Sequence, residues 1–324
     1  MRVKKEYGIL VAIIVALVLY LVLREREKTH YRLPELPRLA GTEISKIEIS
    51  KAEGPIILTK KDNRWYIDPR RFPADSRRIK EMLAAIEKLT LTALVSESKN
   101  YSRYDLSSDK KIIVRAWAGD NLMREFEVGK TAPSFRHTFV RLADDDRVYH
   151  AYGNFRGKFD RPAEDLWDRT VLSFVRTEIE GIYITKGEQS ILLGRTEIPV
   201  EVSTGQRPDA EKKPPPKPEI LWQSADAKKG DQSAINRLLT ALSNLRCQKY
   251  VEDRKKEDLK DPIYSVKLRG AEEYTLSIFA KSDKEAKDYP AVSSQSDFPF
   301  LISDQQAGKI MQDPDELLEK PDRP

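Results

Sequence analysis

Residues 42–49 read TEISKIEI, and residues 177–184 read TEIEGIYI. The isoleucines of the two stretches coincide when one is shifted by 135 residues. Near the end of each stretch they occupy alternate positions, which is typical of a strand with one buried face. A period of this length corresponds to a whole domain. The repeated strand therefore indicates that the chain contains one structural unit twice.

The agreement between the two copies extends to one amphipathic helix in each. An aspartate, Asp75 or Asp231, precedes an apolar stripe with the same spacing in both copies. This spacing is typical of a helix with one buried face, and a carboxylate just before it can accept hydrogen bonds from the free N–H groups of the first turn. The stripes consist of Ile79, Leu83, Ile86 and Leu89, and of Ile235, Leu239, Leu242 and Leu245.

The strand and helix patterns together predict an α+β fold. Each copy should form a mostly antiparallel sheet with a helix on one face, and an N-terminal transmembrane helix should precede the two homologous domains. A proline-rich insertion at about 197–219 should form a surface loop in the second copy. The expected parts are a cytoplasmic N-terminus (1–7), the transmembrane helix (8–23), an extended tether (24–41), repeat 1 (42–174) and repeat 2 (175–324).

Residues 8–23 contain no charge and no proline in an otherwise polar chain. As a helix they cover about 24 Å, and flanking lysines and arginines can extend this towards the ~30 Å of a hydrocarbon core. A cleaved signal peptide and a buried core helix are the alternatives, but no small residues follow Leu23 where a signal peptide would be cut. The excess of Lys and Arg before residue 8 predicts a single-pass protein of the bacterial inner membrane, with a cytoplasmic N-terminus and a periplasmic bulk.

Charge and residue usage argue against several functions. The formal net charge is +5, but eight of the 57 Lys/Arg and four of the 52 Asp/Glu lie in residues 1–41. The remainder is nearly neutral, so nucleic acid is not expected as a partner. One cysteine, Cys247, cannot supply a disulfide framework or a multi-cysteine metal site. Nucleophile elbows and phosphate-binding glycine motifs do not occur in the sequence. We therefore expect no enzyme activity, catalytic residue, cofactor or metal.

The segment 60–80 differs from its counterpart in the second copy by its basic and aromatic residues. Such a surface suits an anionic lipid headgroup, an anionic glycan or an acidic protein. The alternative is a solvated face whose arginines pair with nearby acids. The candidate contact residues, called the four arginines below, are Arg70, Arg71, Arg77 and Arg78.

Several short motifs resemble a bacterial domain family of unknown function. They are Trp65, Pro73-Ala74-Asp75, Tyr104-Asp105-Leu106, Val128-Gly129, Phe139-Val140-Arg141, Val148-Tyr149 and Leu166 with Arg169. The family's tyrosine-glycine-leucine turn has aspartate as its middle residue here. Members of this family are membrane-anchored and often accompany ABC transporters of the gliding-motility type. The resemblance implies an auxiliary extracytoplasmic component and supplies no catalytic residue.

The expected function is a non-enzymatic, membrane-anchored scaffold or accessory subunit of an ABC-type transporter complex. Its partners would then be other subunits of a membrane-protein complex. One alternative is a binding module for anionic envelope glycan or lipid that uses the segment 60–80. A weaker alternative is an envelope hydrolase with a carboxylate pair, because acids are abundant and their spatial pairing cannot be read from sequence.

Overall fold

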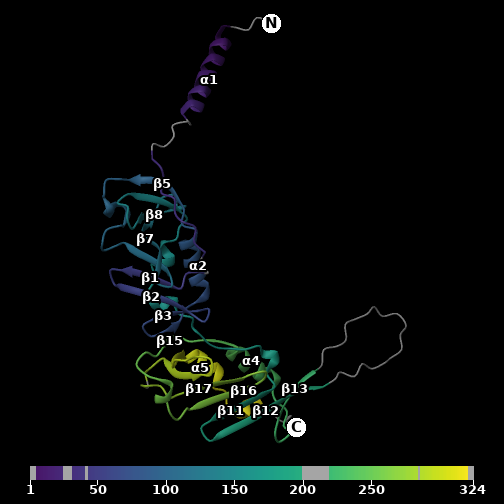
Figure 1. Cartoon of the computed structure of the whole chain (residues 1–324). Helices are drawn as coiled ribbons and strands as arrows, with labels where there is room; N and C mark the ends of the chain where they lie inside the picture. The colour runs from purple at the N-terminus through teal and green to yellow at the C-terminus, as the bar shows by residue number, and fades with distance from the viewer. Residues whose placement is uncertain (1–4, 25–30, 41–42, 199–218, 284, 320–324) are drawn as a thin grey trace, which may run out of the picture. The chain divides into compact units, whose positions relative to one another are not determined.

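A computed structural model describes residues 5–24, 31–40, 43–198, 219–283 and 285–319 (Figure 1). The chain divides into two compact units, residues 1–167 and 168–324. This division falls earlier than the expected boundary after residue 174, because β10 (Thr170–Ser173) pairs with β14 (Asn244–Arg246) of the second unit. Most of the expected loop at 197–219, and parts of the expected N-terminus and tether, lie outside the described residues.

The described part of the first unit is built on a nine-stranded sheet with the order β4-β3-β2-β1-β6-β7-β8-β9-β5. Its paired neighbours are antiparallel. The strands are β1 (Lys46–Lys51), β2 (Gly54–Lys61), β3 (Arg64–Asp68), β4 (Phe72–Pro73), β5 (Leu91–Ser96), β6 (Ile112–Ala118), β7 (Asn121–Thr131), β8 (His137–Leu142) and β9 (Val148–Tyr152). The helices are α1 (Lys5–Arg24), α2 (Ser76–Glu87) and α3 (Arg156–Phe159).

The described part of the second unit contains an eight-stranded antiparallel sheet with the order β13-β12-β11-β16-β17-β18-β19-β15, and the small β10–β14 sheet. Its remaining strands are β11 (Gly181–Lys186), β12 (Gln189–Ile198), β13 (Glu219–Ser224), β15 (Lys249–Tyr250), β16 (Tyr264–Arg269), β17 (Glu273–Ile278), β18 (Asp288–Ser293) and β19 (Phe300–Ser303). Its helices are α4 (Gln232–Leu242) and α5 (Asp304–Ile310).

The two large sheets follow the same order along the chain. From β3 to β5 the first sheet corresponds strand by strand to the second from β13 to β15, and β4 is an additional edge strand. The helices α2 and α4 occupy the same place in the two sequences of elements. This common order is what an internal duplication produces, and the duplication itself stays a prediction.

Each of these two helices begins at the aspartate predicted to cap it. Asp75 Oδ1 accepts hydrogen bonds from the backbone N–H groups of Arg77 and Arg78, at 2.9 and 3.1 Å. Asp231 Oδ1 accepts the equivalent bonds at 2.8 and 2.9 Å. A carboxylate in this position satisfies N–H groups that have no partner within the helix. Both capping predictions are confirmed.

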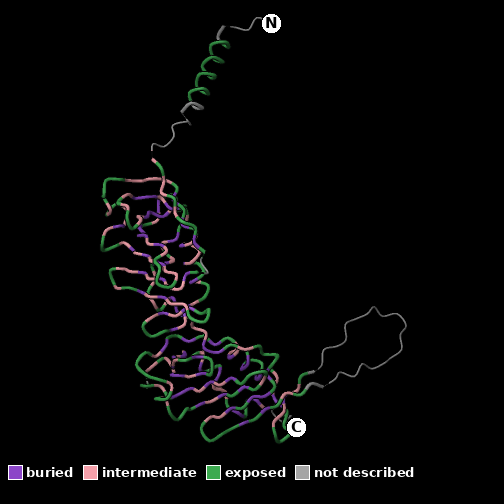
Figure 2. Tube along the Cα trace, viewed as in Figure 1, coloured by how far each residue is buried: buried purple, intermediate pink, exposed green. Residues whose placement is uncertain are grey.

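The buried face of α2 differs from the predicted stripe at one position. Ile79 and Ile86 are buried, but Met82 takes the central place and Leu83 is only partly buried. In α4, by contrast, Leu239 and Leu242 are buried as expected. Figure 2 shows the buried residues concentrated inside each of the two units.

The expected α+β fold with an N-terminal transmembrane helix is wrong. The described residues form mainly antiparallel strands in three sheets, and apart from α1 the α-helices of the two units are short, at 4 to 12 residues. Helix α1 does form over the expected span, but no helix in the described part is long and apolar enough to cross a membrane. The uncharged stretch covers only about 24 Å, against ~30 Å for a hydrocarbon core. The expected location as a single-pass inner-membrane protein is wrong for the same reason.

The described end of the expected tether packs against the first unit. Leu39 is buried, and the guanidinium of Arg124 donates hydrogen bonds to the carbonyl oxygens of Pro37 and Ile86. It thereby joins this segment to the last turn of α2. Burial lowers the pKa of Arg124 below its ordinary value. Carbonyl oxygens compensate its charge here, as expected for an ion largely removed from water.

Two of the family-like motifs contact each other in the first unit. Asp105 has a left-handed backbone conformation with φ of 54°, a region that glycine and aspartate adopt more readily than most residues. The turn is closed by the Leu106 N–H, which donates to the Tyr101 carbonyl at 3.0 Å. Gly129 of β7 lies directly against this turn, and a Cβ added there would overlap the Tyr104 carbonyl oxygen. The turn and the strand therefore approach closely because Gly129 has no side chain.

Candidate functional site

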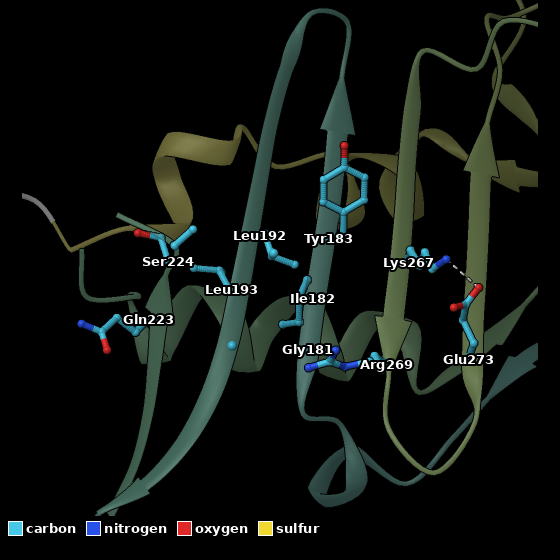
Figure 3. Close-up of a pocket in the computed structure, with 12 residues that line it drawn as sticks. Gly181, Ile182, Tyr183, Leu192, Leu193, Gln223, Ser224, Lys267, Arg269 and Glu273 are labelled. Atoms are coloured by element: carbon cyan, nitrogen blue, oxygen red, sulfur yellow. Dashed lines mark ion pairs between the residues drawn. The ribbon is translucent and has the colours of Figure 1, made fainter. Parts of the chain in front are cut away.

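The open face of the second sheet contains a hollow of about 560 Å³ (Figure 3). Strands β13, β12, β11, β16 and β17 all contribute to it. Alternate residues of these strands, such as Ile182, Leu193 and Leu268, are buried on the other face. Because side chains alternate along a strand, the residues between them face the solvent. The hollow is thus built from outward-facing positions on a rigid sheet.

Two glycines form the floor of this hollow. Gly181 and Gly194 are paired across β11 and β12, with Arg269 and Gln223 next to them on the outer strands. Neither glycine has a positive φ, so the backbone does not require glycine at either position. A Cβ added at Gly194 would meet nothing within 4 Å, and one at Gly181 would lie 3.5 Å from Arg269 Nε. Gly194 therefore leaves open space, whereas Gly181 is buried and the Arg269 side chain lies against it.

Two large apolar side chains border the hollow. Tyr183 and Leu192 are paired across β11 and β12, and they are 42% and 55% exposed. Most side chains of this type are removed from water when a sheet face is packed, and burying each is worth about 1.5–3 kcal/mol. An adjacent pair left exposed beside a hollow is a common feature of binding surfaces.

The charged residues of the hollow differ in their pairing. Lys267 Nζ lies 2.9 Å from Glu273 Oε1, and both side chains are about half exposed (Figure 3). An ion pair so exposed contributes about 0–1 kcal/mol. Arg269 is exposed, and its guanidinium has no hydrogen bond or ion pair within the described part of the chain. Arg269 is therefore the cation of this hollow that remains available to a ligand.

The corresponding face of the first sheet is filled instead. Lys46 and Thr59 occupy the positions of the two glycines in the paired strands β1 and β2. Lys46 Nζ lies 4.4 Å from the centroid of the Trp117 ring, and Trp117 stands in the register position of Arg269. One row further along, Arg115 makes ion pairs with Glu48 at 3.1 Å and with Glu125 at 3.0 Å. The hydrogen bond to Glu125 raises the pKa of Arg115. Charged and aromatic groups thus occupy this face.

The four arginines lie in the first unit, at the β3–β4 turn and the start of α2. Three of them are exposed, whereas Arg78 is partly buried, with its Nε 3.9 Å from Asp75 Oδ2. The guanidinium carbon of Arg71 lies 5.1 Å from the centroid of the Tyr66 ring. The predicted contact residues therefore come from two adjacent segments, and some already have intramolecular partners.

Sequence reasoning did not identify the hollow. The available signal was a departure between the copies, since Gly181 and Gly194 replace Lys46 and Thr59 in strands whose buried apolar positions match. A glycine in a strand interior commonly marks close approach of a ligand or another backbone.

The carboxyl groups with a resolved pKa shift are all favoured in the ionised form. The hydrogen bond from Arg147 lowers the pKa of Asp145 from 3.8 to about 2. Burial opposes ionisation of Glu127, but hydrogen bonds from Arg141 and Lys111 still lower its pKa. The other resolved carboxyl shifts, at Asp109 and Asp146, are also downward. A general acid needs a raised pKa, so these groups suit structural ion pairs.

Metal binding finds no support in the described residues. They contain no group of three or more His, Cys, Asp and Glu side chains that could hold a metal ion. His137 and His150 stack with ring centroids 5.3 Å apart, but they come from neighbouring strands without a third ligand. Burial and the nearby His137 lower the pKa of His150.

The described residues thus form a two-unit antiparallel-sheet protein with a hollow of about 560 Å³ on the open face of one sheet. The chain belongs to the family described as domain of unknown function (DUF4340), whose model matches residues 65–262. The match begins in β3 of the first unit and ends before β16 of the second. It confirms the resemblance to a family of unknown function. No curated protein and no solved structure matches the chain.

Proposed function

We propose that this protein is a non-enzymatic accessory subunit that binds a partner protein through the hollow in its second unit. The observation that carries this proposal is the contrast between the two sheets. The first sheet fills its open face with Lys46, Trp117 and Arg115, whereas the second leaves a hollow of about 560 Å³ beside Tyr183 and Leu192.

The size and lining of the hollow support a binding role. Ligand sites in proteins commonly have volumes of about 300–1,000 Å³ and combine apolar walls with a few polar groups. Tyr183 supplies an aromatic ring with a polar tip, and arginine and tyrosine are the side chains most enriched at interaction hot spots. Arg269 and Tyr183 stand on adjacent strands here. The resemblance described above favours a subunit of an ABC-type transporter complex as the partner.

A second candidate function is the binding of an anionic glycan, lipid or acidic protein by the four arginines. Its support is the exposure of Arg70, Arg71 and Arg77 in the first unit. The third interpretation, an envelope hydrolase with a carboxylate pair, gains no support from the resolved carboxyl pKa shifts, which are all downward.

Affinity purification of the tagged full-length protein, expressed from its own gene, tests the first proposal. Mass spectrometry should identify an ATPase or permease subunit of an ABC transporter among the proteins recovered. Gly194→Thr should abolish this recovery, because threonine places a branched side chain in the hollow, as Thr59 does in the first sheet. Gly157→Thr is the matched control, since a Cβ at Gly157 also meets nothing within 4 Å but lies in α3.

Recovery of the same transporter subunit by the wild type and by Gly194→Thr would show that the hollow is not the contact. Recovery of no transporter subunit by any form would remove the accessory role. A further variant replaces each of the four arginines with serine. If the transporter subunit is lost only from this variant, the second candidate function is favoured.

A further inference from the structure

The hollow has the geometry to receive an acidic, extended peptide segment, and we infer that its ligand carries an Asp or Glu two residues from a large apolar side chain. This inference rests on the proposed function and specifies the chemistry of the partner. It begins from Arg269, whose guanidinium has no hydrogen bond or ion pair among the described residues.

Arg269 selects an anion. Its planar guanidinium can bind a carboxylate with two parallel hydrogen bonds, which lysine cannot do. Among the described residues, Glu273 is the only acid that lines the hollow, and it is already 2.9 Å from Lys267. A carboxylate placed beside Gly181 would therefore meet one unpaired cation without displacing an existing ion pair. The lack of a side chain at Gly194, the partner of Gly181 on β12, leaves room for this carboxylate near the Arg269 guanidinium.

The positions of Tyr183 and Leu192 determine how far the apolar side chain of the ligand lies from its acidic residue. Tyr183 lies two residues from Gly181 on β11, and Leu192 is paired with Tyr183 on β12. Two residues of a strand span about 6.8 Å, and side chains separated by two residues point to the same face. An extended peptide along β11 that places its acid at Gly181 therefore places the side chain two residues away at Tyr183 and Leu192.

The limited apolar area favours a peptide over a fatty acid. Two exposed side chains, Tyr183 and Leu192, can cover one apolar side chain of a ligand, whereas a long acyl chain needs an enclosed cavity to lose contact with water. The hollow lies on an open sheet face (Figure 3). A fatty acid would leave most of its chain in solvent there.

Selection from a random heptapeptide library displayed on phage tests this inference. The library is selected on the full-length protein after depletion on Gly194→Thr, which fills the hollow. The enriched peptides should contain Asp or Glu and a large apolar residue two positions apart. Peptides that require the hollow but carry no acid would overturn the acidic ligand and leave the proposed binding site intact. If no enriched peptide binds the wild-type protein more tightly than Gly194→Thr, both the acidic ligand and the proposed binding site are overturned.

The affinity of the most enriched peptide, made synthetically, then identifies the role of Arg269. Arg269→Gln should weaken binding about 10- to 100-fold, as expected for loss of hydrogen bonds to a charged group, and Arg269→Lys should weaken it less. Arg254→Gln is the control, because Arg254 is an exposed arginine of the same unit that does not line the hollow. Equal affinities in Arg269→Gln and Arg254→Gln would overturn the inference. Dodecanoate should not displace the peptide, and tighter binding of dodecanoate would show that the site takes a lipid anion.

Discussion

Gly129→Ala should destabilise the first unit by about 3–5 kcal/mol, although it adds only one methyl group. The added Cβ would overlap the Tyr104 carbonyl oxygen and lie 3.0 Å from Leu106 Cγ. Strand β7 cannot easily move away, because it is paired with β6 and β8 on both sides. The turn is likewise held by the hydrogen bond from Leu106 to Tyr101.

The magnitude follows from two contributions. Adding atoms to a well-packed site typically costs about 1–3 kcal/mol in strain. A shift of the turn also exposes Leu106, now 2% exposed in a cluster with Ala132, Phe139 and Val148, and full burial of a leucine is worth about 1.5–3 kcal/mol. Their combined loss is a large fraction of the 5–15 kcal/mol that stabilises a typical protein.

Hydrogen exchange measured by mass spectrometry in increasing denaturant suits this test, because it follows peptides of each unit separately. A single unfolding free energy would not be well defined for a chain of two units. Peptides from β7 and β8 should lose protection at lower denaturant in Gly129→Ala, while peptides from β11 and β16 should not change. Gly194→Ala is the control, and it should leave stability unchanged or raise it by about 0.5–1 kcal/mol, since its Cβ meets nothing within 4 Å. The reasoning is refuted if Gly129→Ala stays within about 1 kcal/mol of the wild type, or if the loss appears in the second unit.

Three further predictions concern ionisation, packing and the basic segment. Because the folded pKa of Asp145 is lowered from 3.8 to about 2, its stabilising effect should be present above pH 3.8 and lost as the pH falls towards 2; Asp145→Asn should remove this part of the pH dependence in acid titrations of unfolding. Leu239→Ala should cost about 2–5 kcal/mol in urea unfolding, and Leu83→Ala should cost less because Leu83 is only partly buried; equal losses would contradict the observed faces of the helices. Serine at the four arginines should leave binding of the selected peptide within about twofold of the wild type, since exposed charges outside a contact contribute little, and a larger loss measured by titration would place the binding site in the first unit.

Local patterns in the sequence predicted the local structure well. The alternating isoleucines of the repeated stretch lie in β1 and β11, with Ile47 and Ile182 buried as the alternation requires. The aspartates before the two apolar stripes cap α2 and α4. The predictions of overall fold class and of a membrane-spanning helix were wrong. They were inferred from one helix per copy and from a single apolar stretch. The short helices and the limited length of the apolar stretch decide against both.

Sequence patterns were sufficient to predict the repeated strand, the two helix caps and the resemblance to a family, because these depend on residues close together in the chain or on similarity along it. They did not predict that β13, β12, β11, β16 and β17 lie side by side in this order, because sheet order depends on pairing between distant segments. The hollow depends on that order and on the register that places Gly181 opposite Gly194 and beside Arg269. The hollow exists because glycines stand at neighbouring positions among strands that come from different parts of the chain. A glycine produces no periodic pattern in the sequence, so the hollow can be recognised only when the pairing of the strands is known.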